Sequence, residues 1–146
     1  MGVLQVSTDK DRLDIELIHR FLREEAYWSR GIPRAVVERA IEGSLCFGGY
    51  LDGRQVAFAR VVTDGATFGY LADVFVVPEY RGQGHAKALM AAVMAHPHLQ
   101  GLRRFTLATL DAHGLNASFG FTAPLRPETL MEKFDSDLYA KAPSGP

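Results

Sequence analysis

The sequence contains a single cysteine, Cys46, so an internal disulfide cannot form. Because small secreted domains commonly depend on disulfides, this lack argues against an extracellular protein. No apolar run approaches the roughly 20 residues that cross a membrane, and the N-terminus lacks the charged and apolar segments of a secretory signal. We therefore expect a cytoplasmic protein without membrane partners.

An excess of charge of either sign is also missing. The 146 residues include 16 Lys and Arg against 17 Asp and Glu, which gives a net charge of −1. Nucleic-acid-binding proteins usually present a strongly basic surface, so the composition predicts no nucleic-acid partner. The hydrophobic share of 47% is ordinary for a globular protein, and this length fits one domain with a sizeable core.

Periodicity and turn signals predict a mixed α/β domain. Asp52-Gly53 and Asp64-Gly65 are hairpin signals that join three strands into an antiparallel meander. Asp9 or Asp11 can cap the first helix. The expected elements are a strand at 3–6, helices at 9–25 and 33–43, strands at 45–50, 55–63 and 67–77, a helix at 81–95, a strand at 105–110, a helix at 112–119 and a strand at 129–134.

This order, βααβββαβαβ, corresponds to six to seven strands with about four helices. We expect one domain over residues 1–137, followed by a flexible C-terminal tail over 138–146 that is rich in small residues and proline.

The most informative stretch joins a strand to a helix. Val74-Phe75-Val76-Val77 is apolar on both faces, as in a central strand that is covered on both sides. Pro78 ends this strand, and Arg81-Gly82-Gln83-Gly84-His85-Ala86 opens the next helix. Glycines let the backbone approach a ligand closely, and the first turn of a helix offers free N–H groups and a positive dipole end. With the charge of Arg81, the stretch predicts a pyrophosphate site.

Two common phosphate loops do not match this stretch. A Walker loop, G-x-x-x-x-G-K-[ST], is absent, and the dinucleotide fingerprint G-x-G-x-x-G needs a glycine where Lys87 stands. The stretch instead resembles the R-x-x-G-x-G/A signature of the GNAT acetyltransferases, with Arg81, Gly84 and Ala86 at the matching positions. Asn116-Ala117-Ser118-Phe119-Gly120-Phe121 resembles the family's Y-x-x-x-G-F ending, so the resemblance spans about residues 3–135.

The resemblance implies a GNAT-like fold and an N-acetyltransferase activity. Acetyl-CoA would be the co-substrate, and a primary amine would attack its thioester directly in a ternary complex, without a metal. Backbone N–H groups near Phe75 and Val77 would polarise the acetyl carbonyl. The cofactor-binding residues that the resemblance implies are Phe75, Val76, Val77, Arg81, Gly82, Gln83, Gly84, His85, Ala86, Asn116 and Phe119.

Two positions depart from the family pattern. Thr109 replaces an asparagine that often ends the strand before the last helix. Asn116 replaces the tyrosine that commonly acts as general acid toward the leaving thiolate. An amide donates a hydrogen bond but cannot give up a proton near neutral pH, so Asn116 is the candidate catalytic residue on the leaving-group side. The lost tyrosine also keeps open a catalytically silent acyl-CoA-binding regulatory module, and a phosphate-binding protein unrelated to coenzyme A is a third alternative.

Three residues are candidates for the acceptor site. Asp73 shares a face of its strand with Phe75, and a carboxylate there is costly unless it is paired or hydrated. Asp73 is therefore a candidate catalytic base or clamp for the substrate ammonium, or a structural partner of Arg60. Tyr27 and Trp28 lie between the first two helices, a connection that arches over the acceptor site in the family. They either bind substrate or fill the core.

Other polar residues carry less chemistry. His96-Pro97-His98 lacks a thiolate or a second ligand cluster and predicts a surface turn rather than a metal site. Cys46 predicts a small core residue. The acceptor stays open among small molecules and peptides that carry an amine, and the oligomeric state stays open between a monomer and a homodimer.

Overall fold

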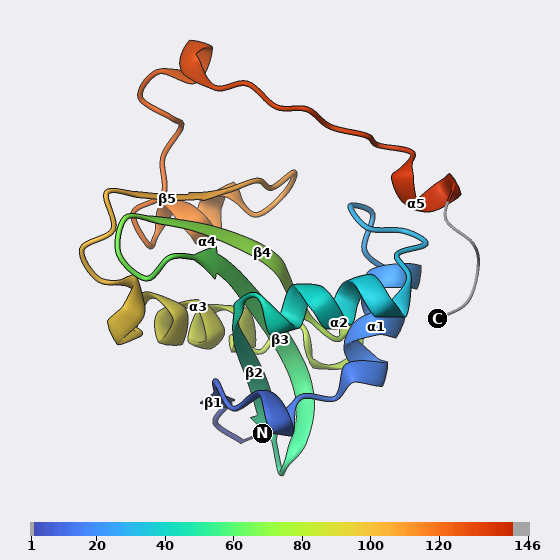
Figure 1. The fold of residues 1–146 in the computed structure, drawn as a ribbon. Coiled ribbons are helices and arrows are strands. Elements are labelled where there is room, and N and C mark those ends of the chain that lie inside the picture. Colours follow the sequence, from blue (N-terminus) through green and yellow to red (C-terminus); the bar gives the residue numbers. More distant parts are fainter. Residues whose placement is uncertain (1, 142–146) are drawn as a thin grey trace.

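Five strands form one mixed sheet, in the order β1-β2-β3-β4-β5, in the computed structural model, which describes residues 2–141 (Figure 1). The pairs β1–β2, β2–β3 and β3–β4 are antiparallel. The pair β4–β5 is parallel, and a crossover helix joins its two strands. The strands are β1 (Gln5–Ser7), β2 (Leu45–Leu51), β3 (Arg54–Thr63), β4 (Phe68–Val76) and β5 (Arg104–Leu107).

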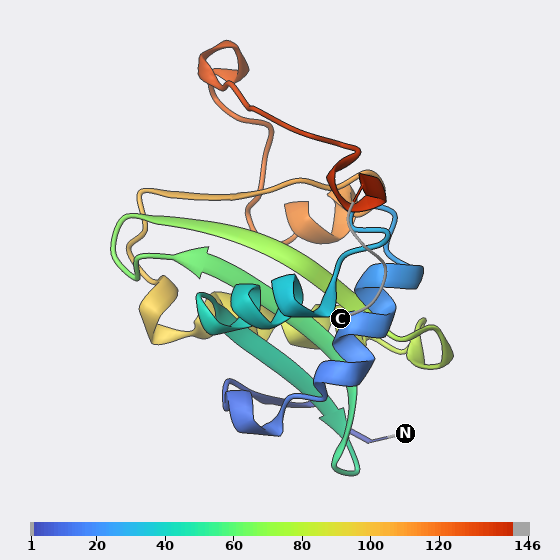
Figure 2. The ribbon, with the colours of Figure 1, turned by 45° about the vertical axis from the view of Figure 1, so that its right-hand side comes forward.

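Helices cover both faces of the sheet (Figures 1 and 2). The α-helices are α1 (Ile15–Glu24), α2 (Arg34–Glu42), α3 (His85–Ala95), α4 (His113–Ala117) and α5 (Leu138–Lys141). α1 packs on β4 through the stacked rings of Phe21 and Phe75, whose centroids are 4.0 Å apart. On the opposite face α3 buries Leu89, Met90 and Val93. None of the helices within residues 2–141 is long and apolar enough to cross a membrane.

The mixed α/β class and the first nine elements of the expected order are confirmed, with shifted boundaries. The helix expected at 9–25 is divided: a 3₁₀ turn at Lys10–Arg12 precedes α1, and Asp14 caps α1 by accepting from the Leu17 N–H. Asp9 caps only the short turn, so the prediction that Asp9 or Asp11 caps the long helix is wrong. α3 begins at His85, because Gly82 and Gly84 before it have left-handed backbones.

The strand expected at 129–134 does not form, so the described residues contain five strands instead of six to seven, and five α-helices instead of about four. After α4 the chain leaves the sheet, and a 3₁₀ turn at Pro127–Thr129 is followed by unpaired backbone. A strand requires a neighbour to accept its hydrogen bonds, and within residues 2–141 no strand pairs with this segment. We call residues 122–137 the C-terminal arm.

The C-terminal arm leads to α5, which returns to the connection between α1 and α2 (Figure 1). A side chain on Gly31 would lie 3.0 Å from the backbone oxygen of Tyr139, so α5 sits directly on that connection. The segment expected as a flexible tail thus begins with a short helix. Residues 142–146 of that tail lie outside the described residues.

Candidate functional site

β4 and β5 separate partway along the sheet. Their pairing runs only from Phe68 and Arg104 to Leu71 and Leu107, where β5 ends. β4 continues to Val76, so its last residues have no strand neighbour on that side within residues 2–141. A strand edge in this situation offers N–H and C=O groups to a ligand.

A bulge in β4 lies where the two strands part. Arg60 pairs with Ala72 and Phe58 with Phe75, so two residues of β4 lie opposite the single residue between them on β3. One of the two is Asp73, whose φ of 55° is unusual for a residue with a side chain. Bulges bend a strand and increase its twist. The bulge thus accounts for the departure of β4 from the line of β5.

The glycine loop lies between the end of β4 and α3. Gly82 and Gly84 have φ values of 76° and 83°, and a side chain at either position would meet nothing within 4 Å. Gly84 is the N-cap of α3 and provides no side-chain cap, and the first helical bond runs from the Ala88 N–H to the Gly84 carbonyl. The N–H groups of the first turn therefore face an open space, which suits an anion.

Two charged or titratable residues flank this loop. Arg81 donates from Nε to the carbonyl of Val76 at 2.9 Å, which ties the loop to the end of β4. His85 is only 7% exposed, and its Nε2 has no hydrogen-bond partner within the described part of the chain. Gln83 and Lys87 are exposed. An open glycine loop, a guanidinium and an unpartnered buried nitrogen fit the pyrophosphate of coenzyme A.

The backbone of β4 differs from the expectation at one amide. The Val77 N–H donates to the carbonyl of Val56 at 2.9 Å, so the prediction that it polarises the acetyl carbonyl is wrong for this structure. N–H groups alternate in direction along a strand, so the Val76 N–H points toward the side where β5 has ended. The side chains of Phe75, Val76 and Val77 are buried, so only their backbone is available to a ligand.

Asn116 lies on α4, on the far side of the separation. It is 8% exposed, and its side-chain amide makes no hydrogen bond to any residue in the range 2–141. The backbone carbonyl of Asn116 accepts hydrogen bonds from the N–H groups of Phe119 and Phe121, which fixes the turn after the helix. Thr109 precedes α4 and accepts the Ala112 N–H on its hydroxyl at 3.0 Å. The unusual threonine therefore supports the helix that carries the unpaired amide.

The acceptor-side candidates come together at the bulge. Trp28 donates from Nε1 to Oδ1 of Asp73 at 2.9 Å, although the two residues are far apart in sequence. Arg60 donates from Nε to Oδ2 of Asp73 at 2.8 Å, and its Nη1 contacts the hydroxyl of Ser44 at 3.0 Å. The expected structural pairing with Arg60 is thus confirmed, and the charge of Asp73 is compensated. Sequence patterns gave no signal for Ser44.

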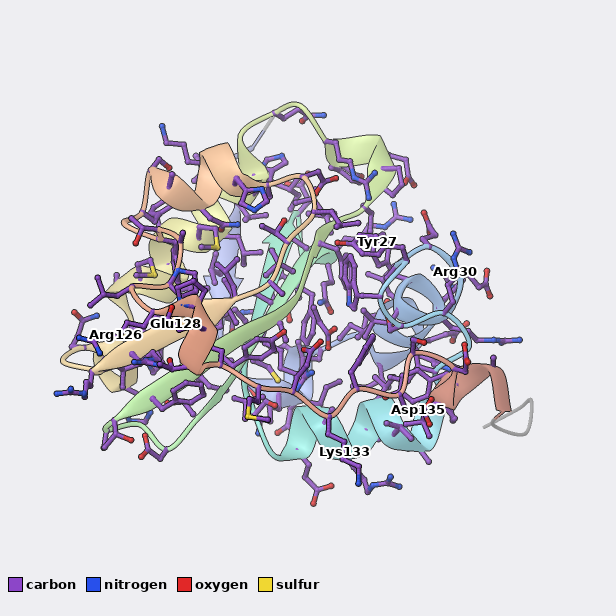
Figure 3. All side chains as sticks on the ribbon, turned by 90° about the horizontal axis from the view of Figure 1, so that it is seen from above. Tyr27, Arg30, Arg126, Glu128, Lys133 and Asp135 are labelled. Carbon is purple, nitrogen blue, oxygen red and sulfur yellow. The ribbon has the colours of Figure 1, made fainter. Side chains whose placement is uncertain are left out.

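Tyr27 and Trp28 form an exposed aromatic pair on the connection between α1 and α2. Their rings meet edge to face at 5.1 Å, and they are 50% and 42% exposed. The alternative that they fill the core is therefore wrong. Figure 3, a view from above, shows both Tyr27 and Arg30 on this connection, with Tyr27 on the side that faces the sheet. Flat rings at the bulge can bound an acceptor pocket.

The turn expected at His96-Pro97-His98 and the core position expected for Cys46 are both observed. His96 and His98 lie around the 3₁₀ turn at Pro97–Leu99, where Nδ1 of His96 accepts the His98 N–H. No three His, Cys, Asp or Glu side chains within residues 2–141 are grouped to bind a metal ion. Cys46 is 1% exposed, and burial raises the pKa of its thiol to about 11, so it is a core residue.

Comparison with known proteins identifies relatives of this chain. The profile of the acetyltransferase (GNAT) family matches residues 15–121. A candidate acetyltransferase of Gibberella zeae is 33% identical over 75% of this chain and 73% of its own. The crystal structure of a candidate GNAT acetyltransferase from Xanthomonas campestris pv. campestris is 63% identical, with a TM-score of 0.94 over 97% of this chain and 99% of that one. A further structure, a candidate acetyltransferase from Deinococcus radiodurans, shares 18% identity and a TM-score of 0.71 over 97% of this chain and 94% of that one, and shows the fold alone.

Proposed function

The chain belongs to the GNAT family of acetyltransferases, and we propose that it transfers an acetyl group from acetyl-CoA to a primary amine on a small molecule or peptide. The observation that carries this proposal is the open loop of Gly82 and Gly84 at the start of α3, beside the edge of β4 that β5 leaves unpaired. The loop suits a pyrophosphate, and the edge suits an extended chain such as pantetheine.

Each candidate residue has a definite task in this proposal. Bound acetyl-CoA supplies a thioester, and the neutral amine attacks its carbonyl directly in a ternary complex. The first-turn amides of α3 hold the pyrophosphate, and the Val76 N–H polarises the carbonyl, because a positioned donor stabilises developing negative charge. Asn116 donates a hydrogen bond on the leaving-group side. Tyr27 and Trp28 bound the acceptor.

Asp73 serves the acceptor site as a positioning residue in this proposal. Both of its oxygens accept a hydrogen bond, one from Trp28 and one from Arg60. Both oxygens are thus occupied by donors of the protein, which hold the carboxylate at the bulge. Proton removal from the amine therefore falls to water, while Asp73 fixes the ring of Trp28.

The function is tested by the release of free thiol from acetyl-CoA across a panel of small amines and peptides. We expect release that depends on one class of amine, with the amine gaining one acetyl group by mass spectrometry. A chain that binds acetyl-CoA by calorimetry and releases no thiol with any amine would contradict the proposal and favour a silent acyl-CoA-binding module.

Replacement of Asn116 by alanine is expected to lower turnover modestly. Coenzyme A leaves well as a thiolate, so the loss of one hydrogen bond costs about 1 kcal/mol, or a few-fold to about tenfold in rate. Asn116→Tyr restores the family's residue and should keep or raise the rate. Ser118→Ala is the matched control, because Ser118 lies just beyond the same helix and donates its hydroxyl to the Leu115 carbonyl. A turnover rate several orders of magnitude lower in Asn116→Ala, with cofactor binding intact, would contradict this expectation and show that Asn116 is essential to the reaction.

Trp28→Ala is expected to raise the KM for the amine while it leaves the KM for acetyl-CoA nearly unchanged. Contact between an amine cation and an exposed indole is worth about 0.5–2 kcal/mol, so the change should be about 2-fold to 30-fold. Trp28→Phe keeps a ring but removes the donor to Asp73, so its KM for the amine should lie between the values of wild type and Trp28→Ala. Equal increases in both KM values would show that Trp28 does not serve the acceptor alone.

A further inference from the structure

The guanidinium of Arg60 is held at two of its nitrogens and free at the third. Nε donates to Asp73 at 2.8 Å and Nη1 to the hydroxyl of Ser44 at 3.0 Å, whereas Nη2 makes no hydrogen bond within residues 2–141. In that part of the chain the only fully buried side-chain nitrogen without a partner is Nε2 of His85, so solvent reaches Nη2 of Arg60. A guanidinium that is already fixed can bind a ligand with little further loss of side-chain freedom.

Arg60 lies where β4 and β5 separate. Its cross-strand partner on β4 is Ala72, which follows Leu71, the last residue of β4 that pairs with β5. The next residue, Asp73, accepts from Arg60 on one oxygen and from Trp28 on the other. The free edge of the guanidinium and the exposed indole therefore flank a single carboxylate, at the place where an acceptor would meet the cofactor.

This part of the surface offers hydrogen-bond donors to a ligand. Each oxygen of Asp73 already accepts a hydrogen bond from the protein, and the N–H groups of Arg60 can only donate. A guanidinium suits both the planar carboxylate and the phosphate group. Repulsion by the nearby charge of Asp73 grows with the charge of the ligand, so a carboxylate with one charge fits better than a phosphate with two.

The sheet face beside Arg60 is apolar and open. Arg60 and Val62 are two residues apart on β3, so their side chains share a face, and Tyr70 is the cross-strand partner of Val62 on β4. Val62 is 42% exposed and Tyr70 38%. Exposed aromatic rings thus lie on both sides of Arg60, with Trp28 beyond the carboxylate and Tyr70 one pair further along the strands. A ligand held by the guanidinium can lay an aromatic group on this face.

We propose that the acceptor is an amine that also carries a carboxylate and an aromatic group, as a free aromatic amino acid does, and that Arg60 binds its carboxylate through Nη2. The amine then lies toward Trp28, and the aromatic group lies on Val62 and Tyr70. This inference rests on the proposed function, because it names the acceptor of the same site. The amine nitrogen bonds to the acetyl carbon, the carbon–sulfur bond breaks, coenzyme A leaves as the thiolate, and the proton of the amine passes to water. The product is an N-acetyl amino acid.

The first test measures binding without turnover. Calorimetry on the chain loaded with coenzyme A compares phenylalanine with phenylalaninamide and phenethylamine, which keep the ring and the amine but lack the carboxylate. We expect phenylalanine to bind about 10-fold to 100-fold more tightly than either, because a hydrogen bond between two charged groups is a strong one. Equal affinities, or no measurable binding of phenylalanine, would overturn the proposal. No acetyl group is present, so the result does not depend on the proposed activity.

The second test assigns the preference to Arg60. In the double variant Arg60→Gln with Asp73→Asn, two amides replace the ion pair, so neither charge is left unpaired. We expect the preference for phenylalanine over phenylalaninamide to disappear, even where both affinities fall. Arg34→Gln is the matched control, because Arg34 also pairs with a carboxylate, Glu38 at 3.2 Å, but on the exposed surface of α2. It should keep the full preference.

A preference that survives in the double variant would overturn the assignment to Arg60. A structural role alone would weaken the binding of both ligands equally and leave their ratio unchanged. The comparison of ligands on wild type decides the proposal even where the double variant does not fold.

The third test repeats the comparison with acetyl-CoA in place of coenzyme A. We expect kcat/KM for thiol release with phenylalanine to exceed the values for the other two amines by about 10-fold to 100-fold. Equal values for all three would overturn the acceptor assignment and leave the proposed activity intact. Tight binding of phenylalanine without thiol release from any amine would contradict the proposed activity and still support Arg60 as a carboxylate site.

Discussion

Gly84→Val is expected to reduce the affinity for acetyl-CoA by at least about 100-fold, which corresponds to roughly 2.7 kcal/mol. The position has a φ of 83°, and a side chain there would project into open space at the start of α3. In the proposed complex that space holds the pyrophosphate, so the valine would separate phosphate from backbone. Calorimetry with acetyl-CoA on folded protein measures the effect directly.

The control for this substitution is Gly65→Val. Gly65 has a φ of 73° and equally open surroundings, but it lies in the turn between β3 and β4, at the opposite end of β4 from the glycine loop. Both variants should lose similar stability, since valine disfavours a left-handed backbone at either site. Only Gly84→Val should lose affinity. Equal affinities in the two variants would refute the assignment of the loop.

Asp73→Ala is expected to lower the free energy of unfolding by about 3 kcal/mol. Its side chain and that of Arg60 are only 12% and 17% exposed, and removal of one partner leaves a mostly buried charge unpaired. Alanine also tolerates the φ of 55° poorly, which adds about 1 kcal/mol of strain. Urea unfolding measures the change, and a variant as stable as wild type would contradict the structural role of the pair.

Asp73→Asn separates the structural contribution from a chemical one. Asparagine accepts a left-handed backbone and keeps one acceptor oxygen for the hydrogen bond from Trp28, so the shape stays while the charge and the acceptor for Arg60 are lost. We expect a smaller loss of stability than in Asp73→Ala and, if Asp73 only positions Trp28, nearly normal turnover. A stable Asp73→Asn protein with turnover reduced by orders of magnitude would identify the carboxylate as a base or a clamp.

The sequence predicted what depends on neighbouring residues and failed where distant partners decide. The meander and the glycine loop follow from local signals such as Asp52-Gly53 and Gly82. The bulge at Asp73 depends on the register between β3 and β4, and its bond to Trp28 joins two segments that no pattern connects. The strand expected at 129–134 does not form, and within residues 2–141 no strand pairs with this segment. The cytoplasmic location and the lack of nucleic-acid partners rest on composition and stay predictions.

The two sides of the separation between β4 and β5 differ in how they are held. β2, β3 and β4 are joined by tight hairpins and paired along most of their length, whereas β5 is held to β4 by four residue pairs after a long crossover. Short pairings with few buried neighbours open locally at a lower free energy than the central strands of a sheet. Amide hydrogens of β3 should therefore exchange with solvent only on global unfolding, while those of β5 exchange earlier. In the proposed complex the cofactor would contact β4 on one side, which stays rigid. On the other side it would contact α4 with Asn116, which can move away from β4 to admit and release it.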